Sequence, residues 1–174
     1  VEGHVQLVRG EERFAVTRAA GVVTGDRIAV SNSGAATIFL FDDKVIYLSE
    51  SSEILLDGTP ANWQVSLVQG EVRVASAGEG GVLLQMGKFK CPASRCVLNA
   101  SLRDGHASIH VEEGQAIVSR LGANVASLGA GNSLQSTGGV TRVSSTVENK
   151  WQQRVLQYQL ASADVLGITR VSMQ

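Results

Sequence analysis

The stretch "FDDKVIYLSESSEILLDG", residues 41–58, consists of two short apolar runs separated by small polar residues. In the first run, Val45 and Tyr47 share one strand parity, and Ile46 and Leu48 share the other. A second apolar run follows, and the stretch closes with Asp-Gly. Successive side chains of a strand point to opposite faces, and Asp, Ser and Gly favour turns. The stretch therefore predicts two consecutive legs of an all-β fold, with its Asp and Ser residues at the corners.

The remainder of residues 1–140 repeats this design of short strands and tight turns. The chain contains 19 Gly and only 2 Pro, a balance typical of many short strands. Residues 33–41 predict an apolar strand covered on both faces, and residues 96–111 predict a hairpin with a type I′ turn at Asp104-Gly105. We expect a twisted two-sheet sandwich or a solenoid-like winding.

Residues 62–76 carry the clearest hairpin-like signal. Before Gly70 the alternating apolar residues have odd numbers, and after it they have even numbers. The phrase "VEEGQAIV", which begins at residue 111, has the same apolar–turn–apolar design. The two phrases predict equivalent, stacked turns. The apolar residues around Gly70 are Trp63, Val65, Leu67, Val72 and Val74.

Residues 141–174 differ from the rest and predict a helix over about 145–166, followed by a terminal strand over 168–174. Ser145 and Glu148 have the spacing of a capping box, and Gly167 suits a helix end. The apolar stripe of this helix contains Val147, Trp151, Val155 and Tyr158. We expect the stripe to dock against the β body or to face a partner. The interface candidates are Trp151, Tyr158, Ile168, Thr169, Arg170, Val171 and Met173.

Charge and hydropathy exclude several classes of partner. The net charge is −1, so no basic field would attract nucleic acid. No apolar run reaches the roughly 18 residues of a transmembrane helix. The sequence begins at Val1, which suggests a processed chain from which a signal peptide has been removed.

Cys91 and Cys96 flank a short segment that contains Pro92. A turn there would bring the cysteines within disulfide distance, so we predict a disulfide, which would indicate an oxidising compartment. Free thiols are one alternative, and half of a zinc site completed by His106 and His110 is another.

The sequence shows no recognisable arrangement of catalytic residues. His106 and His110 are four residues apart on one expected strand, which separates them by about 13 Å on the same face. Asp26 and the pair Asp42-Asp43 occupy expected turns, where Asp forms local hydrogen bonds. Glu112-Glu113 has the character of a solvated corner. We expect no enzyme activity, no cofactor and no metal.

Several phrases, taken in order, resemble the FecR-like domain family of Gram-negative envelope proteins. They are "GHVQLVRG", "VVTGDRIAVSNSGAATIFLFDDKVIYLSESSEILL", "VSLVQGEVRV", "IHVEEGQAIV" and "LGAGNSL", and they cover roughly residues 3–135. The usual Arg-Gly-Thr phrase is replaced here by "CPASRC" and "VLNAS". The resemblance implies an all-β domain located in the periplasm or at the cell surface.

The sequence thus favours a non-catalytic, extracytoplasmic interaction or assembly module. Its partner would be the chain itself, in an oligomer or filament built by strand addition, or another envelope protein. The alternative is a periplasmic signal-relay domain that binds an outer-membrane partner.

Overall fold

The computed structural model describes residues 1–145 except 2, 18, 41–43, 79 and 138–139. Over these residues the chain is all β, as predicted, with fifteen strands and no helix. The strands are β1 (Val5–Arg9), β2 (Glu12–Val16), β3 (Arg27–Val30), β4 (Ala36–Leu40), β5 (Lys44–Leu48), β6 (Glu53–Thr59), β7 (Asn62–Ser76), β8 (Val82–Met86), β9 (Phe89–Ala93), β10 (Cys96–Arg103), β11 (His106–Glu113), β12 (Gln115–Arg120), β13 (Ala123–Gly129), β14 (Ser133–Thr137) and β15 (Val140–Ser144).

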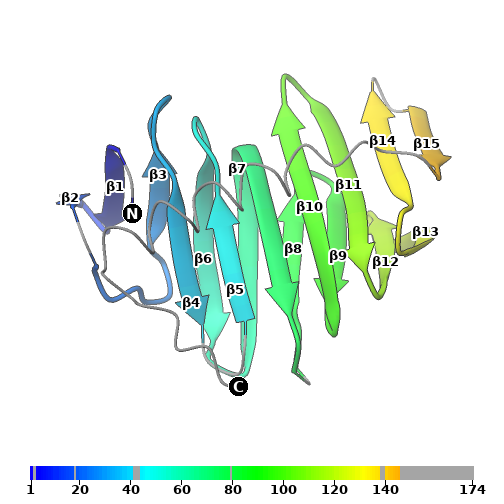
Figure 1. Cartoon of the computed structure of the whole chain (residues 1–174), viewed down its shortest axis with the longest axis horizontal. Coiled ribbons are helices and arrows are strands. Elements are labelled where there is room, and N and C mark those ends of the chain that lie inside the picture. Colours follow the sequence, from blue (N-terminus) through cyan, green and yellow to red (C-terminus); the bar gives the residue numbers. More distant parts are fainter. Residues whose placement is uncertain (2, 18, 41–43, 79, 138–139, 146–174) are drawn as a thin grey trace, which may run out of the picture.

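The strands form two layers around one apolar core (Figure 1). Sheet I has the order β2-β1-β3-β6-β7-β8-β9-β12-β13. Sheet II has the order β4-β5-β7-β10-β11-β14-β15. Within the described residues, neighbouring strands are antiparallel except for β7 and β8, which are parallel. Strand β7 belongs to both sheets.

Alternating side chains build the core, as the strand periodicity predicted. In β5, Ile46 and Leu48 are buried, whereas Tyr47 lies on the opposite face. In β6, Ile54 and Leu56 are both fully buried. The two apolar runs of the opening stretch are thus β5 in sheet II and β6 in sheet I, and the Asp42-Asp43 turn lies outside the described residues.

Strand β7 passes from sheet I to sheet II at Gly70. Before the bend the buried residues are Trp63, Val65 and Leu67, which have odd numbers. After the bend they are Val72 and Val74, which have even numbers, so the face of the strand that is buried changes at Gly70. The hairpin expected over residues 62–76 is therefore wrong: the segment is a single strand whose two halves cover the same core from opposite sides.

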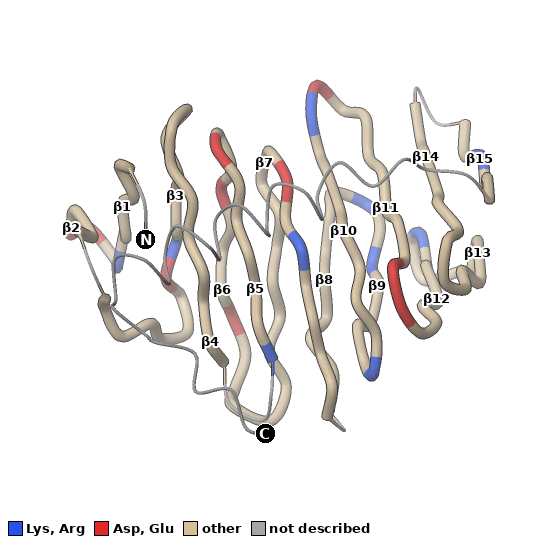
Figure 2. The backbone as a smooth tube through the Cα atoms, viewed as in Figure 1, with Lys and Arg blue, Asp and Glu red and all other residues tan. Residues whose placement is uncertain are grey.

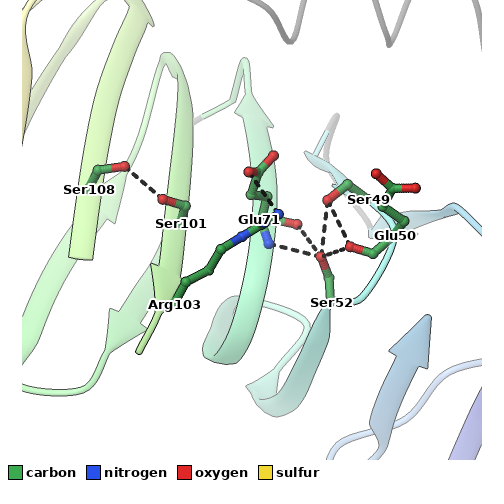
Figure 3. Close-up of polar contacts among 7 residues, drawn as sticks. All are labelled: Ser49, Glu50, Ser52, Glu71, Ser101, Arg103 and Ser108. Atoms are coloured by element: carbon green, nitrogen blue, oxygen red, sulfur yellow. Dashed lines mark hydrogen bonds and ion pairs between the residues drawn. The ribbon is translucent and has the colours of Figure 1, made fainter. Parts of the chain in front are cut away.

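Close contact with the β5–β6 corner requires glycine at this bend. Gly70 has a φ of +88°, and a Cβ there would lie 2.4 Å from Ser52 Oγ and 2.6 Å from the carbonyl oxygen of Ser51. The backbone N–H of Glu71 donates to Ser52 Oγ over 2.8 Å (Figure 3). Ser49 Oγ also lies 3.1 Å from Ser52 Oγ. The serines of the opening stretch are therefore corner residues, as predicted, and they hold the bend of β7.

Gly114 forms a second corner between β11 in sheet II and β12 in sheet I. It has a φ of +79°, and a Cβ there would lie 2.4 Å from the carbonyl oxygen of Arg95. The register places Gly70 opposite Leu102, at one end of β10. Glu113, the residue before Gly114, pairs with Val97 at the other end of β10. The two Gly phrases do form equivalent corners, but at opposite ends of sheet II, so the expected stacking is wrong.

Strand β4 differs from the expectation that both of its faces would be covered. Among the described strands it pairs only with β5 and forms an edge of sheet II. Phe39 on its outer face is 76% exposed. By contrast, the hairpin of β10 and β11 is confirmed, with Asp104 and Gly105 at φ values of 49° and 75°.

The expected helix over 145–166 and the expected strand over 168–174 lie outside the described residues. Among the residues that are described, no helix is long and apolar enough to span a membrane.

A buried carboxylate fixes the turn that leads into β3. Arg9 Nε and Nη2 donate to the two oxygens of Asp26 over 2.8 and 2.9 Å, and the N–H of Val23 donates to Asp26 Oδ2 over 2.8 Å. The Asp26 carbonyl oxygen accepts from the N–H of Leu56. The hydrogen bond from Arg9 holds the pKa of Asp26 below its ordinary value, because it stabilises the ionised form.

Substitution of Gly70 by Ala should destabilise the protein far more than substitution of Gly105 by Ala. Both residues have positive φ, but a Cβ at Gly105 meets nothing within 4 Å. Gly105→Ala should therefore lose only the backbone term of about 1–2 kcal/mol, and Gly70→Ala should lose this plus the clash with Ser52. Urea unfolding measures both losses, and equal losses would show that close approach does not constrain the bend.

Asp26→Asn should lower the free energy of unfolding at pH 7 by about 2 kcal/mol, because a charged hydrogen bond is lost. The pKa of Asp26 is lowered in the folded protein, so its contribution to stability is complete above about pH 4 and disappears as the pH falls through the folded value. Urea unfolding between pH 7 and pH 2 should therefore show a shallower acid slope in Asp26→Asn than in the wild type. Asp104→Asn, in an exposed turn, is the control, and an unchanged slope in Asp26→Asn would contradict the assignment.

Candidate interaction surface

The outer face of sheet II carries a row of polar side chains across four strands. The register sets Tyr47 of β5 beside Arg73 of β7, and Arg73 beside Asn99 of β10. Glu112 of β11 completes the row. We call these four residues the central row. Their position follows from strand parity, because the core takes the alternate residues of each strand.

A β-bulge aims Glu112 into this row. Val97 pairs with Glu113 and Leu98 pairs with Val111, so Glu112 is the additional residue between these two pairs. Bulges redirect side chains in this way. The Glu112 carboxylate thereby reaches over β10 to Arg73 of β7.

The central row is tightly connected. Arg73 Nη2 donates to Glu112 Oε2 over 3.0 Å, and Arg73 Nε donates to the same oxygen over 3.2 Å. Asn99 Nδ2 donates to Glu112 Oε1. The guanidinium carbon of Arg73 lies 5.4 Å from the centre of the Tyr47 ring, within the range of a cation–π contact. The four side chains therefore form one network fixed from both ends.

A second, more exposed group of polar contacts lies near the Gly70 corner (Figure 3). Arg103 Nη2 donates to Glu71 Oε1 over 3.0 Å, and the hydroxyl oxygens of Ser101 and Ser108 lie 2.8 Å apart. Charges of both signs are scattered over the two layers, as Figure 2 shows. A surface of this kind suits specific polar contacts rather than binding driven by net charge.

The two histidines of β11 share the outer face, as predicted. Nδ1 of His106 lies 3.0 Å from Thr137 Oγ1, and Nδ1 of His110 lies 3.1 Å from Ser133 Oγ. Each histidine thus contacts its own hydroxyl on β14. Within the described ranges, no group of three His, Cys, Asp or Glu side chains could hold a metal ion.

The structure does not contain the predicted disulfide: Cys91 and Cys96 are free and buried. Cys91 lies in β9 of sheet I and Cys96 begins β10 of sheet II. The segment between them crosses from one layer to the other instead of closing a small loop, and both side chains belong to the core. Because the histidines of β11 lie on the outer face, they do not complete a zinc site with these cysteines. Burial raises the pKa of Cys91 to about 12 and also raises the pKa of Cys96.

The ends of the two sheets expose apolar side chains. In sheet II, Val143 of β15 pairs with the fully buried Leu134, yet it is 54% exposed because no described strand continues the sheet beyond it. The strands β12 and β15 also expose Ile117 and Val140, and Leu121 is exposed directly after β12. Ile117 and Val140 lie on outer faces, because they alternate with the inward-facing positions, so it is Val143 that leaves the core incompletely covered at β15.

Sequence reasoning did not identify the central row, although each of its residues has the parity of an outer face. The register and the bulge, which bring these residues together, are tertiary features. The predicted interface residues Trp151, Tyr158, Ile168, Thr169, Arg170, Val171 and Met173 lie outside the described residues, and their role stays a prediction.

Both thiols should be unreactive toward a water-soluble disulfide reagent in the folded protein at pH 8. Burial and a raised pKa keep Cys91 in the unreactive thiol form. In denaturant without reductant, two thiols per chain should react. A chain that shows no thiol under these conditions would contain the disulfide that the structure lacks.

The fold is similar to that of known proteins, although no family is shown. Two crystal structures of a "putative anti-sigma factor" from Parabacteroides distasonis match with a TM-score of 0.64, 15% sequence identity and 74% coverage of this chain. The match spans 64% and 63% of those chains, less than two thirds of their length. No protein-family model matches this chain, and no curated protein matches it. The likeness shows the fold, and the FecR-like resemblance stays a prediction for this chain.

Proposed function

We propose that this chain is a non-catalytic, extracytoplasmic binding domain of a signal relay of the anti-sigma-factor type. The observation that carries the proposal is the incompletely covered end of the sandwich at β15. There the core-facing Val143 is half-exposed, and among the described strands the outer side of β15 has no neighbour. An unpaired edge with apolar side chains is a template for another strand. The similarity in fold to the Parabacteroides protein favours a regulatory role over a purely structural one.

Strand addition is the binding mode that this edge supports. An extended segment of the partner would form backbone hydrogen bonds along β15, and its alternate side chains would cover Val143 and extend the core. Thr141 shares the parity of Val143 and lies on the same inner face. The partner would be another envelope protein with an extended segment, and an outer-membrane protein is the candidate consistent with a relay.

Self-assembly is a second candidate, favoured by the opposite end of sheet II. Strand β4 is also an edge, and its Phe39 is 76% exposed. A contact between β15 of one copy and β4 of the next would not be two-fold, and such contacts propagate into filaments when they do not close into a ring. The strand predicted over residues 168–174 would serve the same mode.

Photo-crosslinking tests which partner the edge binds. A photoreactive amino acid at position 143 should give adducts in the native host, because this side chain would lie against an added strand. The same residue at position 68 is the control, since Val68 is an exposed valine of β7 and β7 is paired on both sides. Mass spectrometry of the adduct should identify an envelope protein.

Other outcomes of this experiment would overturn the relay or the binding mode. Adducts between copies of this chain, with filaments in negative-stain images, would establish assembly in place of the relay. Equal adducts at positions 143 and 68, or none at 143, would contradict strand addition at β15.

A further inference from the structure

The tip of the β12–β13 hairpin carries an apolar residue where the backbone disfavours one. Leu121 has a φ of +52° and is 78% exposed, the highest value among the large apolar side chains that the structure describes. The β10–β11 hairpin has a similar turn, with φ values of 49° and 75° at Asp104 and Gly105 against 52° and 86° at Leu121 and Gly122. Asp suits this left-handed position because its short side chain forms local hydrogen bonds, whereas Leu is strained there. Leu121 therefore stabilises the fold neither through its backbone nor through burial.

Basic side chains surround this tip. The N–H of Leu121 donates to the carbonyl oxygen of Lys88 over 3.3 Å, so the β8–β9 turn lies directly beside the tip. Lys90 follows two residues later at the start of β9, and both lysines are exposed. Arg120 precedes the tip, with its guanidinium carbon 5.7 Å from the centre of the Phe89 ring. Three cations thus lie around one projecting leucine.

The charges of sheet I differ between its two halves (Figure 2), although both signs occur in the molecule as a whole. Residues 82–93 and 115–129, which form β8, β9, β12 and β13 with their turns, contain Lys88, Lys90 and Arg120 and no Asp or Glu. The strands of the other half, β1, β2, β3 and β6, carry charges of both signs, at Arg9, Glu12, Arg13, Arg27, Glu53 and Asp57. The net charge of −1 for the whole chain therefore conceals a local excess of positive charge around the apolar tip.

We propose that this tip, formed by Leu121 with Lys88, Lys90 and Arg120, binds the surface of an anionic lipid bilayer. Leu121 would enter the boundary between headgroups and acyl chains, and the three cations would contact the anionic headgroups around it. Peripheral membrane proteins combine these two contributions, and both are present here. A bilayer fits a projecting side chain better than an acidic protein does, because lipid yields around the side chain, whereas a protein needs a preformed pocket.

The same hairpin provides further apolar surface near the tip. Ile117 and Val125, each four residues from Leu121, are 52% and 41% exposed. A hairpin tilted toward the bilayer would bring these side chains to the headgroup level. The contact concerns the tip of a sheet I hairpin and is independent of the proposed binding at the β15 edge of sheet II.

Sedimentation of the full chain with lipid vesicles tests the contact. At low salt the protein should bind vesicles of phosphatidylcholine mixed with phosphatidylglycerol, and it should not bind vesicles of phosphatidylcholine alone. The double variant Lys88→Gln and Lys90→Gln should bind about 25-fold more weakly, because each cation near an anionic surface contributes about fivefold. Arg13→Gln, on β2 at the other end of sheet I, is the control and should leave binding unchanged. Binding to neither kind of vesicle, or equal binding to both, would overturn the proposal.

The variant Leu121→Asn separates the lipid contact from folding, because the two should change in opposite directions. Asn tolerates a positive φ, so the free energy of unfolding in urea should rise. Vesicle binding should fall at least about tenfold, because the inserted apolar side chain is lost. Phe39→Thr, which removes the 76% exposed Phe39 of β4, is the control and should leave vesicle binding unchanged. Unchanged binding by the folded Leu121→Asn variant would contradict the proposal.

A fluorescent label locates the contact. Cys91 and Cys96 are buried, so an environment-sensitive dye should react only with the new thiol of Leu121→Cys. Its emission should shift to the blue on the mixed vesicles, and the same dye on Phe39→Cys should show no shift. A shift at position 39 and none at position 121 would place the membrane contact elsewhere and sink the proposal. Binding to polyglutamate and not to vesicles would identify an acidic protein as the partner and would also overturn it.

Discussion

The contact between Gly70 and Ser52 is the constraint on which the remainder of the structure depends. Strand β7 can belong to both sheets only if its backbone approaches the β5–β6 corner more closely than any side chain would permit. The Ser52 hydroxyl accepts the N–H of Glu71 at the point where the β7 ladder changes sheets. The hydrogen bonds at Ser52 and the missing side chain at Gly70 thereby fix the point where one continuous strand passes between the two layers.

The shared strand also determines where polar chemistry can accumulate. After the bend, the buried parity of β7 changes, so Arg73 points outward from sheet II. The register then sets Arg73 beside Tyr47 on one side and Asn99 on the other. The bulge at Glu112 completes the row. The open edges arise from the same architecture, because two sheets that wind outward from one strand end in β2, β4, β13 and β15. The surfaces that this architecture leaves for a partner are therefore the edges, the outer faces and the hairpin tips, because the interior is occupied by the core.

Local patterns in the sequence predicted much of this fold. The alternation around Ile46, the serine corner and the turn at Asp104-Gly105 are all local properties, and each is confirmed. The parity change around Gly70 was visible too, but a hairpin and a bent strand produce the same pattern, and the tertiary contact with Ser52 decides between them. Whether Phe39 is covered depends on whether another layer packs on the outer face of β4, which periodicity does not report. The spacing of Cys91 and Cys96 suits a small loop and a crossover between layers equally well. The central row was not predictable, because its register and bulge depend on strands distant in sequence.

Native-state hydrogen exchange of the full chain, resolved by residue with NMR, tests the role of the shared strand most directly. If β7 holds both sheets together, amides on both sides of the bend, such as those of Leu67 and Val74, should open with the same free energy, the highest in the protein. The edge strands β2 and β15 should exchange much faster. If the half of β7 before Gly70 opened at a clearly lower free energy than the half after it, the two sheets would unfold independently, and β7 would not be the strand that holds them together.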